Sequence, residues 1–372
     1  MISLETNYAG LQLKNPIVVA AGPWSRNGAS IQRSIDAGAA AVVTETITLE
    51  EVSYRPRPHL FFGTRPEQMF NTTQFSTMSL EQWEQEFECL QKKGCKIIAS
   101  ICGQSPSEMS YLAEKVERMG CDAIEITLSA PVGILNRTRN SSPQEIHDCV
   151  RAAVEATEIP VFVKLSYESA NSRPYLEALE QAGAHGVTAI NSLKGVKGID
   201  LECGCAYMTT YGGYSGAPIR PIALATVATL KQLTHIPVFG CGGIQTAEDA
   251  LEFMMLGACG VQLASVILRE GYSVIGRILS QLEQWMTEHH YQTTDSLIGL
   301  ALNSLWQFED ILPQPLVVQL SEGCDGCGKC TVSCLYDALQ CDGAQISIKS
   351  DQCVGCGMCI AVCPKQALYL SW

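Results

Sequence analysis

Eight cysteines near the end of the chain have a spacing that implies electron-transfer chemistry. They form two runs of identical spacing, Cys-x2-Cys-x2-Cys-x3-Cys, which comprise Cys324, Cys327, Cys330 and Cys334, then Cys353, Cys356, Cys359 and Cys363. Such tandem runs are typical of a pair of [4Fe–4S] clusters, in which the fourth cysteine of each run ligates the other cluster. A single run could also bind zinc, but two in tandem favour clusters. We therefore predict that Cys363 completes the first cluster site and Cys334 the second.

Two turns earlier in the chain could bind a phosphate group. The apolar segments 238–241 and 260–263 end in Gly242-Gly243 and in Ala264-Ser265. Backbone amides in such turns, together with a following helix, form the usual phosphate site of a (β/α)8 barrel. Iron–sulfur clusters carry single electrons, a carbon–carbon double bond needs two, and a flavin exchanges both. We therefore predict FMN with its phosphate here; the alternative is that the glycines only form tight turns.

A lysine and an amide stand at other predicted strand ends, and a second amide lies in the long connection 49–79. Lys164 follows the apolar residues 161–163, where an unpaired charge would be costly. It could stabilise the negative charge of a reduced flavin, or extend its ammonium group from the rim into water. Asn71 and Asn191, with Ser192, carry donors and acceptors that suit a planar heterocycle. The alternative is that these amides cap loops.

The segments that must position these residues alternate between short strands and helices. Strands are predicted at 17–20, 41–44, 97–100, 123–128, 161–165, 186–190, 238–241 and 260–263, and helices at 80–92, 106–119, 143–155, 223–232 and 247–256. Several helices follow capping residues, which are Ser79, Ser105, Ser142 and Thr246. Eight such units predict an α/β fold, a parallel (β/α)8 TIM barrel, with a doubly wound open sheet as the alternative. The long connections 49–79 and 191–221 follow C-terminal strand ends, where barrel enzymes carry their chemistry.

Length, charge and cysteine content limit the class of protein. A chain of 372 residues is long enough for an FMN-binding barrel at 1–292, a connector at 293–320 and a two-cluster ferredoxin-like domain at 321–372. A net charge of −13 without a basic patch disfavours nucleic-acid binding. No apolar run reaches the ~18 residues of a membrane span, and no signal peptide is visible. Eighteen cysteines in such a chain favour the reducing cytoplasm.

Several segments together resemble the FMN barrel of the dihydroorotate dehydrogenase family. They are Ala20-Ala21-Gly22-Pro23-Trp24, the strand with Lys164, Asn191, Gly212-Gly213-Tyr214-Ser215-Gly216, Gly242-Gly243-Ile244 and Ala264-Ser265. With the segment 209–224 and the two cysteine runs, nearly the whole chain resembles the FMN/iron–sulfur half of the dihydropyrimidine dehydrogenases. The resemblance implies FMN, two [4Fe–4S] clusters, a substrate pocket on the flavin face, and a separate FAD-carrying subunit that delivers electrons from NAD(P)H.

The resemblance also implies roles for individual residues. Cofactor contacts are expected at Ala21, Gly22, Glu45, Asn71, Lys164, Asn191, Gly216, Gly242, Gly243, Ala264 and Ser265, and substrate contacts at Asn71, Thr127, Ala130, Asn191 and Ser192. Three positions depart from the family pattern: Glu45 replaces a lysine, Thr127 an asparagine, and Ala130 the cysteine that transfers a proton. The following loop carries Arg137 and Arg139, which could bind a carboxylate or phosphate on the substrate, or face water.

Two hypotheses about function follow. The first is a flavin-dependent oxidoreductase that reduces or oxidises a C=C or C=N bond of a small unsaturated substrate, with Lys164, Ser129 and Tyr211 as catalytic candidates. A pyrimidine substrate stays open, but the departures from the family pattern favour a different, anionic one. The proton that Ala130 cannot supply could come from Ser129, Tyr211, Cys203, Cys205 or a water. The second hypothesis is an electron-transfer subunit without its own substrate. In either case we expect a homo- or hetero-oligomer that receives electrons from a flavoprotein subunit or a ferredoxin.

Overall fold

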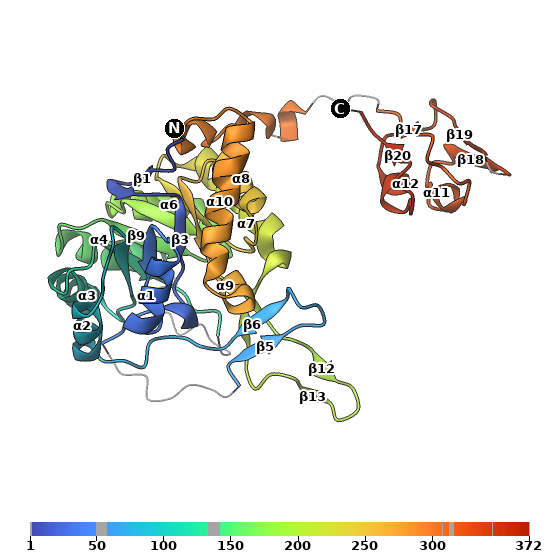
Figure 1. The fold of residues 1–372 in the computed structure, drawn as a ribbon. Coiled ribbons are helices and arrows are strands. Elements are labelled where there is room, and N and C mark those ends of the chain that lie inside the picture. Colours follow the sequence, from blue (N-terminus) through green and yellow to red (C-terminus); the bar gives the residue numbers. More distant parts are fainter. Residues whose placement is uncertain are drawn as a thin grey trace. The chain divides into compact units, whose positions relative to one another are not determined.

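The computed structural model describes residues 2–49, 58–132, 142–306, 308–311, 316–343 and 345–371. The chain divides into two compact units, Met1–Ser304 and Leu305–Trp372 (Figure 1). The division falls inside the segment 293–320 that the sequence predicts to be a connector. The three-part domain division given above stays a prediction.

The first unit is a closed barrel of eight parallel strands. Around the barrel the order is β10-β15-β16-β3-β4-β7-β8-β9. The bounds are β3 Ile17–Val19, β4 Ala41–Val43, β7 Lys96–Ile101, β8 Ala123–Thr127, β9 Val161–Leu165, β10 Gly186–Ala189, β15 Val238–Cys241 and β16 Gly260–Leu263. The predicted TIM barrel is therefore confirmed, and its closure excludes the open doubly wound sheet.

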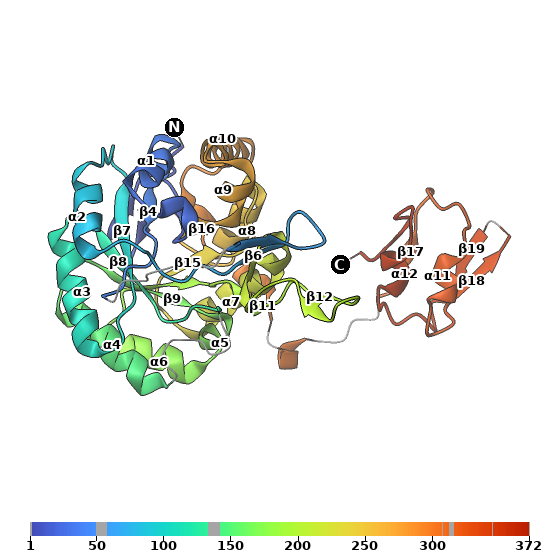
Figure 2. The ribbon, with the colours of Figure 1, turned by 90° about the horizontal axis from the view of Figure 1, so that it is seen from below.

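Helices surround the strands as an outer layer (Figure 2). Their bounds are α1 Gly28–Asp36, α2 Leu80–Glu88, α3 Pro106–Arg118, α4 Pro143–Glu155, α5 Tyr167–Ala170, α6 Arg173–Gln181, α7 Arg220–Leu233, α8 Ala247–Met255, α9 Ser265–Glu270 and α10 Ser273–Glu288. The four predicted caps, Ser79, Ser105, Ser142 and Thr246, each accept a hydrogen bond from a backbone N–H in the first turn of the helix that follows. These bonds satisfy donors that a helix start otherwise leaves unpaired, so they fix where α2, α3, α4 and α8 begin. Among the described residues, no helix is both long and apolar enough to cross a membrane.

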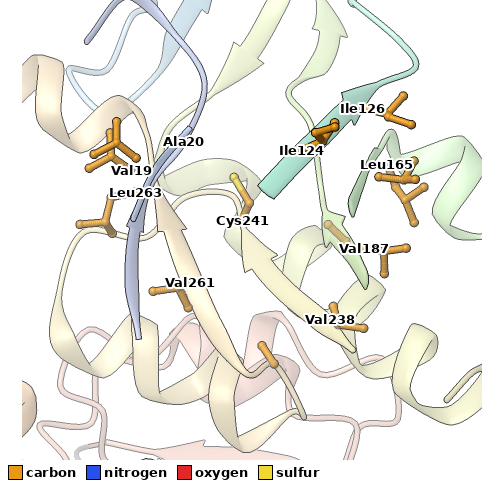
Figure 3. Close-up of a cluster of buried hydrophobic side chains, with 14 of the residues drawn as sticks. Val19, Ala20, Ile124, Ile126, Leu165, Val187, Val238, Cys241, Val261 and Leu263 are labelled. Carbon is orange, nitrogen blue, oxygen red and sulfur yellow. The ribbon is translucent and has the colours of Figure 1, made fainter. Parts of the chain in front are cut away.

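The outward faces of the strands form the main hydrophobic core beneath the helices. Figure 3 shows Val19 of β3, Ile124 of β8, Leu165 of β9, Val187 of β10 and Val261 of β16, and each of these side chains is at most 1% exposed. Strands buried on both faces read as nearly continuous apolar runs. That burial explains why the strands were recognisable from the sequence.

An aromatic plug closes the N-terminal end of the barrel interior. Tyr8 ends β1 (Thr6–Tyr8), which pairs with β2 (Leu11–Leu13). Its ring centroid lies 4.1 Å from that of Phe162 and 4.3 Å from that of Phe239. Gly186 makes room for the tyrosine, because a Cβ there would lie 2.8 Å from the ring. The N-terminal half of the interior is thus filled with apolar rings.

The two long connections contain strands that pair with each other. β5 (Leu60–Phe62) and β6 (Met69–Asn71) come from the first, and β11 (Leu193–Gly195) and β14 (Gly212–Ser215) from the second. They form one antiparallel sheet in the order β11-β14-β6-β5. A short hairpin of β12 (Ile199–Asp200) and β13 (Cys205–Ala206) projects from the second connection (Figure 1). Segments about 140 residues apart therefore build one wall at the C-terminal end of the barrel.

The second unit repeats a small motif twice. Helix α11 (Lys329–Val332) follows Gly328, and α12 (Met358–Ala361) follows Gly357, both glycines with φ near +70°. Strand β17 (Gln319–Leu320) pairs with β20 (Leu368–Tyr369), and β18 (Leu339–Asp342) pairs with β19 (Gln345–Ile348). The left-handed glycines turn the chain sharply between the second and third cysteines of each run.

Tyr8→Ala tests the aromatic plug. Removing a fully buried ring leaves a cavity, and the expected loss is about 3–5 kcal/mol of unfolding free energy. The measurement is the urea midpoint of the barrel, followed by tryptophan fluorescence. Tyr111→Ala is the control, because that ring is 45% exposed and its loss should leave the midpoint nearly unchanged. Equal shifts for the two variants would contradict the plug.

Candidate functional site

A cavity opens at the C-terminal ends of the barrel strands, and the space between its walls, part of which is open to solvent, measures about 1060 Å³. Its floor and sides come from the ends of seven barrel strands, and β6 and β14 of the small sheet contribute Met69, Asn71, Gly213 and Ser215. A concave site at this end of a (β/α)8 barrel is where such folds carry their chemistry.

Most of the residues proposed from the sequence lie in the wall of this cavity. They are Ala21, Gly22, Glu45, Asn71, Thr127, Ser129, Ala130, Lys164, Asn191, Ser192, Gly242, Gly243, Ala264 and Ser265. Their roles toward a flavin or a substrate stay predictions. What the fold contributes is that residues from both long connections and from distant strands meet at one place.

Other candidates are not part of the wall. Tyr211 is 44% exposed, and its ring lies beneath the ammonium group of Lys194 at 4.9 Å. Gly216 packs so closely against the backbone carbonyl oxygen of Glu67 that no side chain would fit there. Cys203 and Cys205 are exposed on the β12–β13 hairpin and its loop. Arg137 and Arg139 belong to 133–141, which lies outside the described residues.

Lys164 lies at the centre of a buried polar network in the barrel interior. Its Nζ donates to Gln262 Oε1 at 2.5 Å and lies 3.9 Å from Glu125 Oε1. Gln262 Nε2 donates to Glu125 Oε2 at 2.6 Å, and Thr188 Oγ1 donates to the same oxygen at 2.7 Å. The network joins β8, β9, β10 and β16, so it holds the lysine in one place.

The electrostatics of this network keep Lys164 charged. Burial by itself would lower the pKa of Lys164, but Cys241, whose sulfur accepts a hydrogen bond from Nζ at 3.5 Å, and the carboxylate of Glu125 raise it above its ordinary value. Burial also raises the pKa of the Cys241 thiol, so this thiol is neutral at neutral pH. The carboxylate of Glu125 is therefore the countercharge of the ammonium group. A fixed positive charge thus borders the cavity.

A line of hydroxyl groups runs from β8, the strand beside Lys164, across β7 to the segment that follows β4. Thr46 Oγ1 lies 2.9 Å from Ser100 Oγ, which lies 3.0 Å from Thr127 Oγ1. Thr46 and Thr127 line the cavity, and Ser100 is fully buried between them. Hydroxyls donate and accept equally, so this line can reorient its hydrogen bonds toward a ligand.

Two asparagines are oriented by local hydrogen bonds. Asn191 Nδ2 donates to the backbone carbonyl of Ser129 at 2.8 Å, and Asn191 Oδ1 accepts from the N–H of Ser192 at 2.8 Å. Asn71 Oδ1 accepts from the N–H and the hydroxyl of Thr73. The Asn191 bonds join the ends of β8 and β10, so this amide also shapes the cavity wall.

The donor set fits a planar cofactor that carries a phosphate, such as FMN. Gly242 and Gly243 have φ values of 130° and 79°, and a Cβ at Gly243 would collide with the backbone of Arg220. The turn therefore presents bare backbone beside Ala264 and Ser265, which suits a phosphate. The ammonium group of Lys164 and the amides of Asn71 and Asn191 suit the polar edge of a heterocycle.

Sequence reasoning missed the partners of Lys164. Glu125, Thr188 and Gln262 stand at inward-facing positions of strands that otherwise read as apolar. A carboxylate in the middle of such a strand is the signal that could have revealed them, because an unpaired buried charge is costly. The partner itself was not predictable, since it lies on strands that are remote in the sequence.

The second unit gathers the eight predicted cluster cysteines into two cavities. One is lined by Cys324, Cys327, Cys330 and Cys363, and the other by Cys334, Cys353, Cys356 and Cys359. Backbone N–H groups point at sulfur: Gly326 donates to Cys324 Sγ at 3.5 Å, and Ala367 to Cys363 Sγ at 3.3 Å. Among the described residues, no three His, Cys, Asp or Glu side chains lie close enough together for a single metal ion.

The family models and the curated relatives that match this chain agree on one family for the barrel. A family model described as dihydroorotate dehydrogenase matches residues 3–286, and one described as a 4Fe-4S dicluster domain matches residues 316–364. The dihydroorotate dehydrogenase B (NAD(+)) catalytic subunit of Pyrococcus abyssi is 33% identical over 301 residues, which span 80% of this chain and 99% of that protein. The subunit of the same name from Thermoplasma acidophilum is 31% identical over 305 residues, which span 81% and 100%. That from Methanocella arvoryzae is 32% identical over 302 residues, which span 81% and 98%.

A double-mutant cycle tests the countercharge of Lys164. Glu125→Gln should cost about 3–5 kcal/mol of unfolding free energy, because it leaves a buried ammonium group without its carboxylate. Lys164→Met should cost a comparable amount, and the double variant should lose less than the sum of the two. Urea denaturation measures all three. Glu155→Gln, in the exposed pair with Arg151, is the control and should change stability by less than about 0.5 kcal/mol. Additive losses at Glu125 and Lys164 would contradict the pairing.

Proposed function

The chain belongs to the dihydroorotate dehydrogenase family, whose members are flavin-dependent oxidoreductases acting on CH–CH bonds, and we propose that it exchanges electrons between its dicluster domain and a small unsaturated substrate. The substrate's C=C or C=N bond would be reduced, or formed by the reverse oxidation, in the cavity of the barrel. The observation that carries this proposal is the cavity itself, in which a compensated lysine, two oriented amides and bare glycine turns face one space.

The cavity residues divide into two groups for this reaction. We assign the turns at Gly242–Gly243 and Ala264–Ser265 to the phosphate of FMN, and Lys164, Asn71 and Asn191 to its ring system. When bound, FMN supplies hydride transfer to carbon and exchanges one or two electrons with other carriers. The ammonium group of Lys164 is held where it favours negative charge on the ring.

The substrate is proposed to be a planar molecule of pyrimidine-like size that carries an anionic group. The curated relatives are named for dihydroorotate, which supports a pyrimidine-like ring. Thr127 and Ala130 line the cavity where the family has an asparagine and a cysteine, and these departures support a substrate other than uracil or thymine. Arg137 and Arg139, known from the sequence alone, would bind the anionic group.

Proton transfer at the substrate carbon must come from a group other than Ala130. Ser129 lines the cavity beside it, whereas Tyr211, Cys203 and Cys205 are not among the cavity residues. We therefore assign the proton to the hydroxyl of Ser129 or to a water held there. An electron relay without its own substrate is the second candidate function, and the loss of the family's acid at Ala130 is what favours it.

Each cysteine quartet of the second unit would bind one [4Fe–4S] cluster. The crossed membership supports this assignment, since Cys363 lies with the first run and Cys334 with the second. Electrons would reach these clusters from a ferredoxin or from a flavoprotein subunit that carries FAD and uses NAD(P)H. The relatives are named as catalytic subunits, which supports a hetero-oligomer, and a cytoplasmic location stays a prediction.

Cofactor analysis tests the cluster assignment. Purified anaerobically, the protein should contain about eight irons and about one FMN per chain. Cys327→Ala with Cys363→Ala removes ligands from one site only, so about four irons should remain. Cys327→Ala with Cys334→Ala damages both sites and should lose nearly all iron. Cys341→Ala, an exposed cysteine outside both quartets, is the control. Similar iron contents in the two double variants would contradict the crossed ligation.

Reoxidation of the reduced protein tests the substrate and the proton donor. Uracil and thymine should reoxidise the reduced protein slowly. Ala130→Cys alone should not restore rapid reoxidation by either compound, because Thr127 and Glu45 also alter the cavity.

The proton donor is tested with the reactive substrate from a panel that includes orotate. Ser129→Ala should slow reoxidation by that substrate about 10²–10⁴-fold if Ser129 is the acid. Ser280→Ala, on the surface of α10, is the control. Rapid reoxidation by uracil would contradict this view of the cavity, and a response to partner protein alone would favour the relay.

A further inference from the structure

A pair of neighbouring cysteines stands apart from both the clusters and the cavity. Cys203 and Cys205 are exposed, whereas Cys95, Cys102 and Cys121 are buried. Cys203 lies in the loop 201–204 between β12 and β13, and Cys205 is the first residue of β13. The reaction proposed for the barrel uses neither thiol, so their pairing calls for a separate explanation.

The hairpin holds the two thiols together. Asp200 Oδ1 accepts from the N–H of Glu202 at 2.9 Å and from the N–H of Cys203 at 3.4 Å, which orders the start of the loop. Gly204 has a φ of 67°, and this left-handed turn brings Cys205 Sγ to 3.5 Å from the carbonyl oxygen of Cys203. The thiol of Cys205 is therefore held against the backbone of Cys203. A dithiol is thus arranged before any oxidant arrives.

We propose that Cys203 and Cys205 form a thiol–disulfide exchange site that reacts with low-molecular-weight disulfides and closes to an intramolecular disulfide. One protein thiolate attacks the small disulfide, whose S–S bond breaks to release one small thiolate and leave a mixed disulfide. The second protein thiolate then attacks the Sγ of the first cysteine, which forms the intramolecular disulfide and releases the other small thiolate. The protein thiols lose two electrons and two protons, and the small disulfide becomes two thiols.

The placement of the two cysteines favours ring closure. Within a mixed disulfide on either cysteine, the other thiol lies two residues away on the same hairpin, close to the sulfur that it attacks. This proximity favours closure over release of the adduct.

The hairpin is joined to the wall of the cavity through buried contacts. Met208, which is 4% exposed, follows β13, and its sulfur accepts from the N–H of Lys197 at 3.2 Å. The methyl group of Met208 lies against Gly212 at the start of β14, the strand that carries Gly213 and Ser215 to the cavity. The exchange itself needs neither FMN nor iron, so its test stands independently of the proposed function.

The test treats the anaerobic holoprotein with increasing oxidised glutathione and maps thiols by differential alkylation. Trypsin should release the peptide 198–231, because Pro221 blocks cleavage after Arg220. This peptide contains Cys203 and Cys205 and no other cysteine. This peptide should lose the mass of two hydrogens and carry no glutathione. Half-oxidation should need ~tenfold less oxidised glutathione than half-modification of Cys89, an exposed cysteine without such a neighbour.

Single variants separate ring closure from simple accessibility. Cys203→Ser and Cys205→Ser should each leave a stable glutathione adduct on the remaining thiol, since the second attack is lost. Cys89→Ser should leave closure of the pair unchanged. Two glutathione adducts on the unaltered peptide, or two free thiols at a concentration that fully modifies Cys89, would overturn the proposal.

Discussion

The charge of Lys164 inside the barrel is the constraint on which the rest of the site depends. An ammonium group at this depth requires a carboxylate, and Glu125 provides it from the neighbouring strand. Thr188 from the other neighbouring strand and Gln262 from across the barrel complete the network, so four strands must close in the correct register before the lysine is stable. The aromatic plug around Tyr8 fills the other end of the interior and confines the polar layer to the cavity end.

The cavity depends equally on pairing between the two long connections. The pairing of β6 with β14 aligns Asn71 with Gly213. The amide of Asn71 and the side-chain-free backbone of Gly213 therefore lie in the same wall as Ser192. Gly213 is required there, because a side chain would collide with Ser192. The shape of this part of the cavity wall therefore depends on a sheet that lies outside the barrel.

The second unit, Leu305–Trp372, is built from two similar halves. Left-handed glycines at Gly328 and Gly357 start short helices after the second cysteine of each run. Pairing of β17 with β20 returns the end of the second half to the start of the first. This return brings Cys363 to the first quartet and Cys334 to the second. Each site thereby needs both halves, so neither cavity can form before the unit has folded.

The sequence by itself determined the barrel, the helix starts and the two cysteine runs, because each rests on local signals. Apolar strands, caps such as Thr246 and Cys-x2-Cys spacing act over a few residues and need no distant partner. Only the tertiary structure decided that Glu125 faces Lys164, that β6 pairs with β14, and that Tyr211 stays outside the cavity wall. These outcomes depend on strand register and on residues far apart in the chain. A contact of that kind leaves no local pattern, because the sequence around one residue does not show which distant residue it will contact.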